Sequence, residues 1–464
     1  MNEAAAASPI DVDLRLDGAT VVRTATPLDV IDDATILVKG NRLVHVGPRA
    51  QCPREVSARR SVDLSGHLVV PGMLNVHTHT ILSMVRGVAE DMGFAPAYTP
   101  GVPHGHDVTP DEAVALARLG ALEALLFGST LINDSFVHAE VALPAMEAVG
   151  LRVSACGRIH DVDFSRVHLG EWQHHDAIGD ATLAAAIDLH KAWDGKAQGR
   201  IGVQLTPHAP DTCSKALLAR VAAHAAPRGI RVATHLSQSR IENRRVAERD
   251  GCSPTELLES VGLLDDRLIA AHGMYLSDAD ILRAGRAGIH LAHIPKGNAS
   301  GGRIAPTRKM RDAGISLALA TDNMHGDMIE TMRWALCMAR IQAECIDETW
   351  QPADVLEMAT MAGARAMGKA DDLGSLEPGK LADLVAIDFR RAHLTPRTNM
   401  LGTLVHTGQG RDVAMVVVDG RIVVEDGAPT LVDAAEILAK GEAAARALWS
   451  RARAEVAGGG VRRD

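Results

Sequence analysis

Short apolar runs without polar alternation recur along the chain, and segments with helical periodicity separate most of them. Such runs are typical of parallel strands that are buried on both faces. There are eight: the run that leads to His77, and residues 129–133, 151–156, 201–206, 231–235, 268–272, 288–293 and 316–322. Helical patterns cover residues 111–126, 180–193, 214–226, 253–261 and 278–287. Eight buried strands that alternate with helices predict an α/β fold, a (β/α)8 TIM barrel.

Several of these runs end in residues that can bind a metal or move a proton. These residues are His77, His79, His235, His272 and Asp322. Residues i and i+2 of an extended strand point to the same side, so His77 and His79 project together. Taken alone, the His-x-His pair is equally compatible with two surface histidines in a turn. Because the carboxyl ends of all barrel strands meet at one face, the recurrence favours a common site.

His77, His79, His235 and Asp322 would offer three nitrogens and one oxygen to a metal ion. This set suits Zn²⁺, Fe²⁺, Co²⁺ or Mn²⁺ and leaves a position for water. The pKa of a metal-bound water falls to about 7, which supplies hydroxide at neutral pH. Asp322 can also accept a proton from that water, and His272 can hydrogen-bond the hydroxide or a developing oxyanion.

The segments around these residues carry a family resemblance. The motifs are Pro-Gly-x-x-x-x-His-x-His at 71–79, Thr-Pro-His-Ala-Pro at 206–210, Thr-His-Leu-Ser-Gln-Ser-Arg-Ile-Glu at 234–242, Ala-His-Gly at 271–273, His-Ile-Pro-Lys-Gly-Asn at 293–298 and Ala-Thr-Asp at 320–322. Flanking segments at 40–47 and 374–385 match as well. From about residue 14 to about residue 430, the chain resembles the amidohydrolase superfamily, in particular its cytosine deaminase-like and s-triazine hydrolase-like branch.

The resemblance implies a domain organisation and a metal count. In this family, strands from both chain ends form a small β-sandwich beside the barrel, which we expect from residues 12–65 and 380–430. The barrel is expected over 66–379, and a C-terminal helix and tail over 431–464. The family positions bind one divalent ion, with His272 beside the metal-bound water. Binuclear relatives use a lysine at the end of the fourth strand, and this strand has none. Cobalt or zinc is the expected ion, with iron or manganese as alternatives.

Gln238 departs from the family pattern. Deaminases and dechlorinating triazine hydrolases of this branch have glutamate there, which protonates a ring nitrogen before hydroxide attacks the adjacent carbon. Glutamine cannot deliver a proton, although its amide can hydrogen-bond. Glu242, four residues on, matches the family's second glutamate. The departure brings the chain nearest to the phenylurea hydrolases and the molinate (thiocarbamate) hydrolase.

Other polar residues are weaker candidates. His208, Asn298 and His293 are expected to bind substrate, although for His208 and Asn298 a structural role fits equally well. Four histidines in polar or Pro/Gly-rich loops are expected at the surface: His104, His106, His174 and His175. The loop over residues 87–110 is rich in proline and apolar residues, and either a substrate cover or an oligomer contact would suit it.

The composition limits the partners. The 464 residues carry a formal net charge of −10 without a cluster of Lys and Arg, which disfavours a nucleic-acid surface. No run approaches the roughly 18 apolar residues of a membrane span, and the first residues lack a signal pattern. Six cysteines without Cys-x-x-Cys spacing indicate a reducing compartment. We expect a cytoplasmic enzyme that acts on a small molecule, and the resemblance implies a homo-oligomer.

These patterns favour one function over two others. Attack on an electrophilic carbonyl needs no ring-protonating acid, so Gln238 predicts a metal-dependent hydrolase of a C–N or C–S bond in a small neutral phenylurea or thiocarbamate of the herbicide type. The alternative is a deaminase or dechlorinase of a heteroaromatic ring such as a pterin, purine, pyrimidine or s-triazine. A non-catalytic relative is disfavoured, because all four metal ligands are present.

Overall fold

The barrel strands occur where the apolar runs predict them. The structure, a computed structural model, describes residues 10–92, 101–323, 325–346 and 348–458. The strands are β6 (Met73–Thr78), β7 (Ser129–Phe136), β8 (Arg152–Ile159), β9 (Ile201–Val203) with the short β10 (Thr206–Pro207), β11 (Val232–Leu236), β12 (Leu268–His272), β13 (His290–His293) and β14 (Ser316–Leu319). The fold confirms the predicted (β/α)8 TIM barrel.

The barrel closes through two short bridges between parallel arcs. One arc runs from β6 to β10 and the other from β11 to β14. Leu205 pairs with Val232 between the arcs, and Thr78 pairs with Asp322 where the last strand meets the first. The second bridge lies at the carboxyl ends of the strands, so it places the predicted ligands of β6 beside the one that follows β14.

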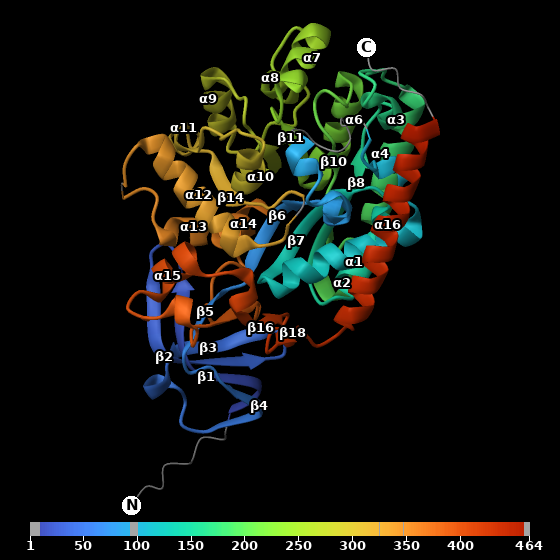
Figure 1. The fold of residues 1–464 in the computed structure, drawn as a ribbon. Helices are drawn as coiled ribbons and strands as arrows, with labels where there is room; N and C mark the ends of the chain where they lie inside the picture. Colours follow the sequence, from blue (N-terminus) through green and yellow to red (C-terminus); the bar gives the residue numbers. More distant parts are fainter. Residues whose placement is uncertain (1–9, 93–100, 324, 347, 459–464) are drawn as a thin grey trace, which may run out of the picture.

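Helices cover the outside of the barrel (Figure 1). They are α1 (Pro110–Leu126), α2 (Ala139–Glu147), α3 (Phe164–Val167), α4 (Asp176–Trp193), α5 (Lys196–Gly199), α6 (Lys215–Ala225), α7 (Arg240–Asp250), α8 (Pro254–Ser260), α9 (Asp278–Ala287), α10 (Pro295–Ser300), α11 (Thr307–Asp312), α12 (Met328–Ala343), α13 (Pro352–Ala359), α14 (Met361–Ala366), α15 (Met400–Thr407) and α16 (Ala434–Gly458). Side-chain caps explain several of the predicted starts. The Ser277 side chain accepts a hydrogen bond from the Asp280 backbone and begins α9 at the predicted residue.

Strands from both chain ends form a second layer below the barrel (Figure 1). A nine-stranded sheet contains β1 (Ile10–Thr24), β2 (Asp29–Lys39), β3 (Arg42–Pro48), β4 (Val56–Asp63), β5 (His67–Pro71), β15 (Leu384–Asp388), β16 (Val413–Val418), β17 (Arg421–Glu425) and β18 (Ala428–Pro429). β15 pairs with β5 in antiparallel register, which joins the two ends of the chain. The predicted domain boundaries stay a prediction, and β5 lies beyond residue 65.

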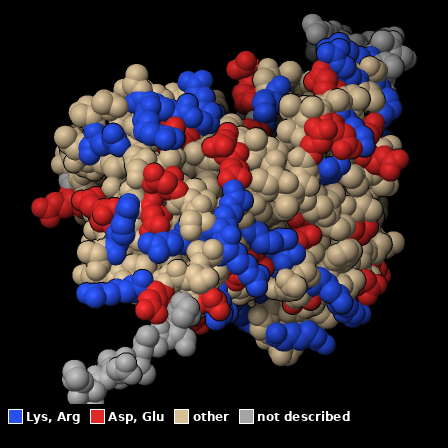
Figure 2. Space-filling view, turned by 90° about the horizontal axis from the view of Figure 1, so that it is seen from below, with Lys and Arg blue, Asp and Glu red and all other residues tan. Residues whose placement is uncertain are grey.

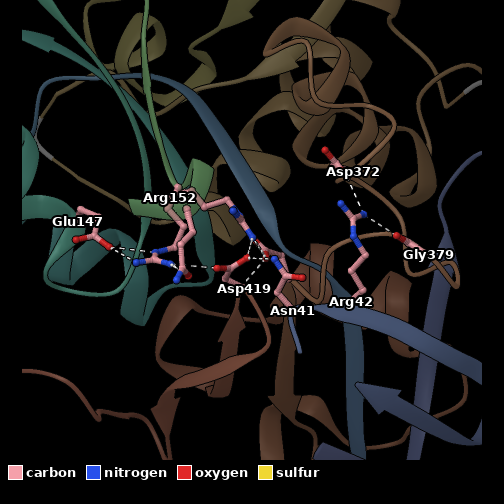
Figure 3. A network of polar contacts seen from close by, with 10 residues as sticks. Asn41, Arg42, Glu147, Arg152, Asp372, Gly379 and Asp419 are labelled. Atoms are coloured by element: carbon pink, nitrogen blue, oxygen red, sulfur yellow. Dashed lines mark hydrogen bonds and ion pairs between the residues drawn. The ribbon is translucent and has the colours of Figure 1, made fainter. Parts of the chain in front are cut away.

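A buried polar network ties this sheet to the barrel (Figure 3). Arg152, the first residue of β8, donates to both carboxylate oxygens of Asp383 at 2.8 and 2.9 Å and to Asp419 at 2.8 Å. All three side chains are at most 4% exposed. Arg200 bonds Asp419 and Glu147 beside them. Because Arg152 begins its strand, the network lies at the end of the barrel opposite the strand carboxyl ends, where stability rather than chemistry is expected.

The last helix packs along the barrel wall, and the lower face is mixed in charge. Trp449 of α16 donates a 2.8 Å hydrogen bond to the Met84 carbonyl, and Arg451 pairs with Glu112 of α1. Figure 2 shows basic and acidic side chains interspersed over the face seen from below. No helix in the described part of the chain is long and apolar enough to cross a membrane.

Candidate metal centre and active site

Backbone hydrogen bonds between the ends of β6 and β14 assemble half of the site. The Asp322 amide donates to the His77 carbonyl at 3.0 Å, and the His79 amide donates to the Asp322 carbonyl at 3.0 Å. Below them, the Asn75 side chain donates to the Thr321 hydroxyl at 2.7 Å. This closure of the barrel brings three predicted ligands from residues far apart in the sequence to one point.

The four predicted metal ligands converge. His79 Nε2 lies 3.3 Å from His235 Nε2 and 3.4 Å from Asp322 Oδ1, and His77 Nε2 lies 3.6 Å from the same oxygen. Two ligands about 2.0–2.1 Å from a tetrahedral ion are roughly 3.4 Å apart, so these separations fit one ion. His77, His79 and His235 form one group of potential ligands, and His77, His272 and Asp322 form another that shares His77.

The second ring nitrogens support the same assignment. His79 Nδ1 donates to the Ser135 carbonyl at 2.6 Å, and His235 Nδ1 donates to the His208 carbonyl at 2.6 Å. Each bond fixes the tautomer whose Nε2 lone pair faces the cluster. His77 Nε2 is buried without a hydrogen-bond partner among the described residues. The unpartnered lone pair of His77 Nε2 lies beside those of His79 and His235 and beside the Asp322 carboxylate. This set of donor atoms fits a divalent cation.

Burial keeps these imidazoles neutral. It lowers the pKa of His77 to about 3, with a further contribution from His272. It also lowers the pKa of His79 to about 3, with His77 adding to the effect. The pKa of His235 falls well below its usual value for the same reason. Neutral imidazoles at pH 7 have the free lone pair that metal binding requires.

His272 faces the cluster from the end of β12. Its Nε2 lies 4.0 Å from Asp322 Oδ2, and Asn298 Oδ1 lies 3.1 Å from its Nδ1. A 4.0 Å gap is too long for a direct hydrogen bond but can be bridged by one oxygen atom. His272 and Asp322 both have positive φ, 75° and 63°. Non-glycine residues in this conformation store strain and concentrate at functional sites.

A cavity of about 380 Å³ opens above the cluster. His79, His235, His272 and Asp322 face it, together with the predicted residues Gln238, His208 and Asn298. His208 donates or accepts a 2.8 Å hydrogen bond with the Thr212 hydroxyl, and the Asn298 amide nitrogen is buried without a partner in the described part of the chain.

His293 is not among the residues that line this cavity, although it was expected to bind substrate. It is 2% exposed at the end of β13. Ala292 packs with Ala233 and Ala271, and the next residue of a strand points to the other side. The strand register therefore directs His293 away from the cavity.

The loop histidines differ from one another. His106 and His175 are exposed as expected, but His104 is buried, at 8% exposure. Its ring stacks between those of His106 and His168, with centroids 5.2 and 5.0 Å away. His104 and His106 both line the cavity. The expected surface position of His104 is therefore wrong, because packing against the barrel covers it. Residues 93–100 of the proline-rich loop lie outside the described residues.

Gln238 lies at the cavity wall, where a buried carboxyl group positions its backbone. Glu242 Oε1 and Oε2 accept hydrogen bonds from the amides of Ser237 and Gln238, both at 2.8 Å. Glu242 is fully buried, and burial, with Asp211 nearby, raises its pKa to about 8. It does not line the cavity, so Glu242 holds the loop rather than contacting a substrate.

Several lining residues escaped sequence analysis. Arg158 lies over the Phe164 ring at 4.0 Å and the Phe136 ring at 5.4 Å, and Tyr275 and Arg303 also line the cavity. Arg158 is in the carboxyl-terminal half of β8, so its strand position was the available signal. Tyr275 and Arg303 lie in loops without a periodic pattern, and only the fold places them.

Comparisons with known proteins identify relatives over nearly the whole chain. Residues 68–423 match the model of the amidohydrolase family. A 5-methylthioadenosine/S-adenosylhomocysteine deaminase from Desulforudis audaxviator is 35% identical over 422 residues, covering 89% of this chain and 94% of the relative. A 5'-deoxyadenosine deaminase from Methanothermobacter thermautotrophicus is 33% identical over 423 residues, with the same coverage.

Solved structures agree on the fold. An adenosine deaminase from Xanthomonas campestris with bound zinc superposes with a TM-score of 0.84 at 26% identity, covering 96% of this chain and all of the other. Atrazine chlorohydrolase from Arthrobacter aurescens with zinc superposes with a TM-score of 0.84 at 24% identity, covering 93% of this chain and all of the other.

These relatives overturn the predicted substrate. The expectation of a phenylurea or thiocarbamate is wrong, because the matched relatives are named nucleoside deaminases and align over nearly their full length. The alternative of a ring deaminase agrees better with the findings. The error came from one position, because the missing acid at Gln238 was given more weight than a resemblance to deaminases that extends over nearly the whole chain.

Proposed function

The chain belongs to the amidohydrolase family of metal-dependent hydrolytic enzymes, and we propose that it deaminates purine nucleosides. The substrate class is adenine nucleosides, including those altered at the 5' carbon. The observation that carries the proposal is the 35% identity, over 89% of the chain, to a deaminase of such nucleosides. The converging side chains of His77, His79, His235, His272 and Asp322 support it, since hydrolytic deamination requires an activated water.

The proposed cofactor is one divalent ion, with zinc favoured. His77, His79, His235 and Asp322 would hold it, and the separations of 3.3–3.6 Å among their ligand atoms suit a single ion. Zinc-bound neighbours of the same fold favour this metal. When bound, such an ion lowers the pKa of water to about 7 and so makes hydroxide available at neutral pH.

Asp322 and His272 handle the proton of the attacking water. Asp322 Oδ2 and His272 Nε2 are 4.0 Å apart and both border the cavity, so one water oxygen can contact both. The carboxylate accepts the water proton and later delivers it to the departing amino group, which leaves as ammonia. Asn298 keeps His272 oriented, so that its Nε2 stays directed at the oxygen.

Gln238 acts on the ring. Its amide can donate a hydrogen bond to a ring nitrogen as negative charge develops there during attack on the adjacent carbon. This bond stabilises the charge without transferring a proton. We therefore infer that ring activation is weaker than in an enzyme with an acid at this position.

Steady-state assays on zinc-loaded protein test the proposal. We expect ammonia release and the ultraviolet change from adenine to hypoxanthine with 5'-methylthioadenosine, 5'-deoxyadenosine, S-adenosylhomocysteine or adenosine. His272→Ala is the control for contaminating deaminase, because it should retain metal and lose most turnover. Metal-replete wild-type protein that releases no ammonia from any of the four nucleosides would overturn the proposal.

A further inference from the structure

Two arginines from different elements contact one tyrosine at the cavity wall. Arg303, in the segment after α10, donates from Nε to the Tyr275 hydroxyl. The guanidinium of Arg240, the first residue of α7, lies 5.2 Å from the centre of the Tyr275 ring. All three residues line the cavity that contains His272 and Asp322. Tyr275 thus holds two positive groups at the same part of the wall.

Neither guanidinium has a carboxylate partner among the described residues. In the part of the chain that the structure describes, the Arg303 guanidinium otherwise donates only to the Gly302 carbonyl, and the Arg240 guanidinium contacts only the tyrosine ring. Two other arginines of α7 differ, since Arg244 pairs with Glu248 and Arg249 with Asp250. Guanidinium groups bind carboxylates and phosphates strongly, so an unneutralised pair facing a cavity suits an anionic ligand group.

The charge of the cavity supports this assignment. Four basic side chains line it, and they are Arg158, Arg240, Lys296 and Arg303. The acidic lining residues are Glu90 and the proposed metal ligand Asp322. Lys296 is neutralised by Glu330 at 2.8 Å. An excess of positive charge here contrasts with the net charge of −10 for the whole chain, so it is local to the site.

Short connections link these arginines to the reaction centre. The Arg303 amide donates to the Asn298 carbonyl at 2.9 Å, and the Asn298 side chain bonds His272. Arg240 follows Gln238 by two residues. A substrate whose ring contacts Gln238 would therefore have its remaining part within the same cavity as both guanidinium groups.

We propose that Arg240, Arg303 and Tyr275 form a subsite for an anionic group on the 5' side of the nucleoside. The inference rests on the proposed function and narrows its substrate class. The recognised chemistry is a carboxylate or phosphate, as supplied by S-adenosylhomocysteine or by adenosine 5'-phosphate. Both would accept hydrogen bonds from the guanidinium groups, whereas 5'-methylthioadenosine offers no anion.

A comparison of anionic and uncharged nucleosides distinguishes binding at the subsite from the deamination reaction itself. Wild-type kcat/KM should be higher for one of the two anionic nucleosides than for 5'-methylthioadenosine, and the advantage should shrink as salt is raised. Arg303→Gln and Arg240→Gln should each lower kcat/KM for the preferred anionic substrate roughly tenfold or more, mainly through KM. Turnover of 5'-methylthioadenosine should stay within about twofold. Comparison of the carboxylate with the phosphate identifies the source of the anion.

Arg244→Gln is the matched control, because Arg244 lies on the same helix at 65% side-chain exposure. This substitution should not change kcat/KM for either the anionic or the uncharged nucleoside. Equal losses for charged and uncharged substrates, or no wild-type preference for either anion, would overturn the subsite while leaving deamination intact. If no nucleoside is turned over, the proposed function fails by itself. Calorimetric binding to the metal-loaded protein then decides the subsite: tighter binding of an anionic nucleoside that Arg303→Gln abolishes supports it, and absence of such binding refutes it.

Discussion

Asn298 Oδ1 lies 3.1 Å from Nδ1 of His272 and accepts a hydrogen bond from it, so a residue of the short helix α10 sets the orientation of a ring at the end of a neighbouring strand. Asn298→Ala should lower kcat about 10–100-fold, because the ring loses its fixed tautomer. Metal content should not change. Asn298→Asp keeps an acceptor and should recover part of the activity, with a shifted pH profile. Loss of metal in Asn298→Ala would contradict this role.

The metal assignment predicts a division among the histidines. His77→Ala, His79→Ala, His235→Ala and Asp322→Ala should each lower bound metal and abolish turnover. His272→Ala should keep the metal and lose most activity, since His272 Nε2 lies 4.0 Å from the Asp322 carboxylate and acts on the attacking water rather than on the ion. Elemental analysis per subunit, with activity measured on the same samples, tests this. An empty site in His272→Ala, or two ions in the wild type, would show the assignment to be wrong.

Gln238→Glu should increase ring deamination. A glutamic acid can transfer a proton to the ring nitrogen, and general acid catalysis typically contributes about 10²–10⁴-fold. Because the site already functions with an amide, we expect a gain in kcat at the lower end, about 10²-fold. Gln238→Leu removes both hydrogen-bonding and acid functions and should reduce kcat below wild type. A Gln238→Glu variant slower than wild type on every nucleoside would exclude a ring-directed role for this position.

Arg152→Met should destabilise the protein strongly. It leaves Asp383 and Asp419 facing each other in a buried interface without their cation (Figure 3), at a cost of about 3–5 kcal/mol. Arg220→Met removes an ion pair with Asp180 whose side chains are 50% and 64% exposed, so it should cost about 0–1 kcal/mol. Urea unfolding of the three proteins provides the comparison. Equal midpoints for both variants would contradict an essential role for the buried network.

The stability that Asp419 provides should depend on pH. Burial raises the pKa of Asp419, but the charge of Arg152 and hydrogen bonds from Arg152, Asn41 and Arg200 outweigh it and leave the pKa below its usual value. Because the pKa of Asp419 is lower in the folded state, its carboxylate stabilises the folded protein at pH values above its unfolded-state pKa of about 4. This stabilisation is lost as the pH falls through the folded-state pKa. The difference in unfolding free energy between wild type and Asp419→Asn should be constant from about pH 7 to 5 and shrink below about pH 4. A difference in unfolding free energy that grows on acidification would contradict this prediction.

The repeating pattern of the barrel was predictable because local sequence carries it. All eight apolar runs overlap a barrel strand, and α9 begins and ends at the predicted residues Asp278 and Ala287. Burial on both faces requires apolar residues in the strand, and that requirement is visible without any tertiary contact. Strand ends are similarly marked, so His235 and Asp322 could be singled out before their 3.3–3.6 Å neighbours were known.

Which side chains line the cavity was decided by tertiary structure. His293 belongs to a family motif, yet the register of β13 directs it away from the cavity, whereas Tyr275 and Arg303 in unpatterned loops line it. Gln238 led sequence analysis to a carbonyl substrate, because one missing acid outweighed the resemblance of the whole chain to deaminases. Sequence by itself determined the barrel strands, several of the helices and the residues at the strand ends, since their pattern is local. Only the fold decided which side chains share the cavity, because loop residues are positioned by packing against distant segments and not by their spacing along the chain.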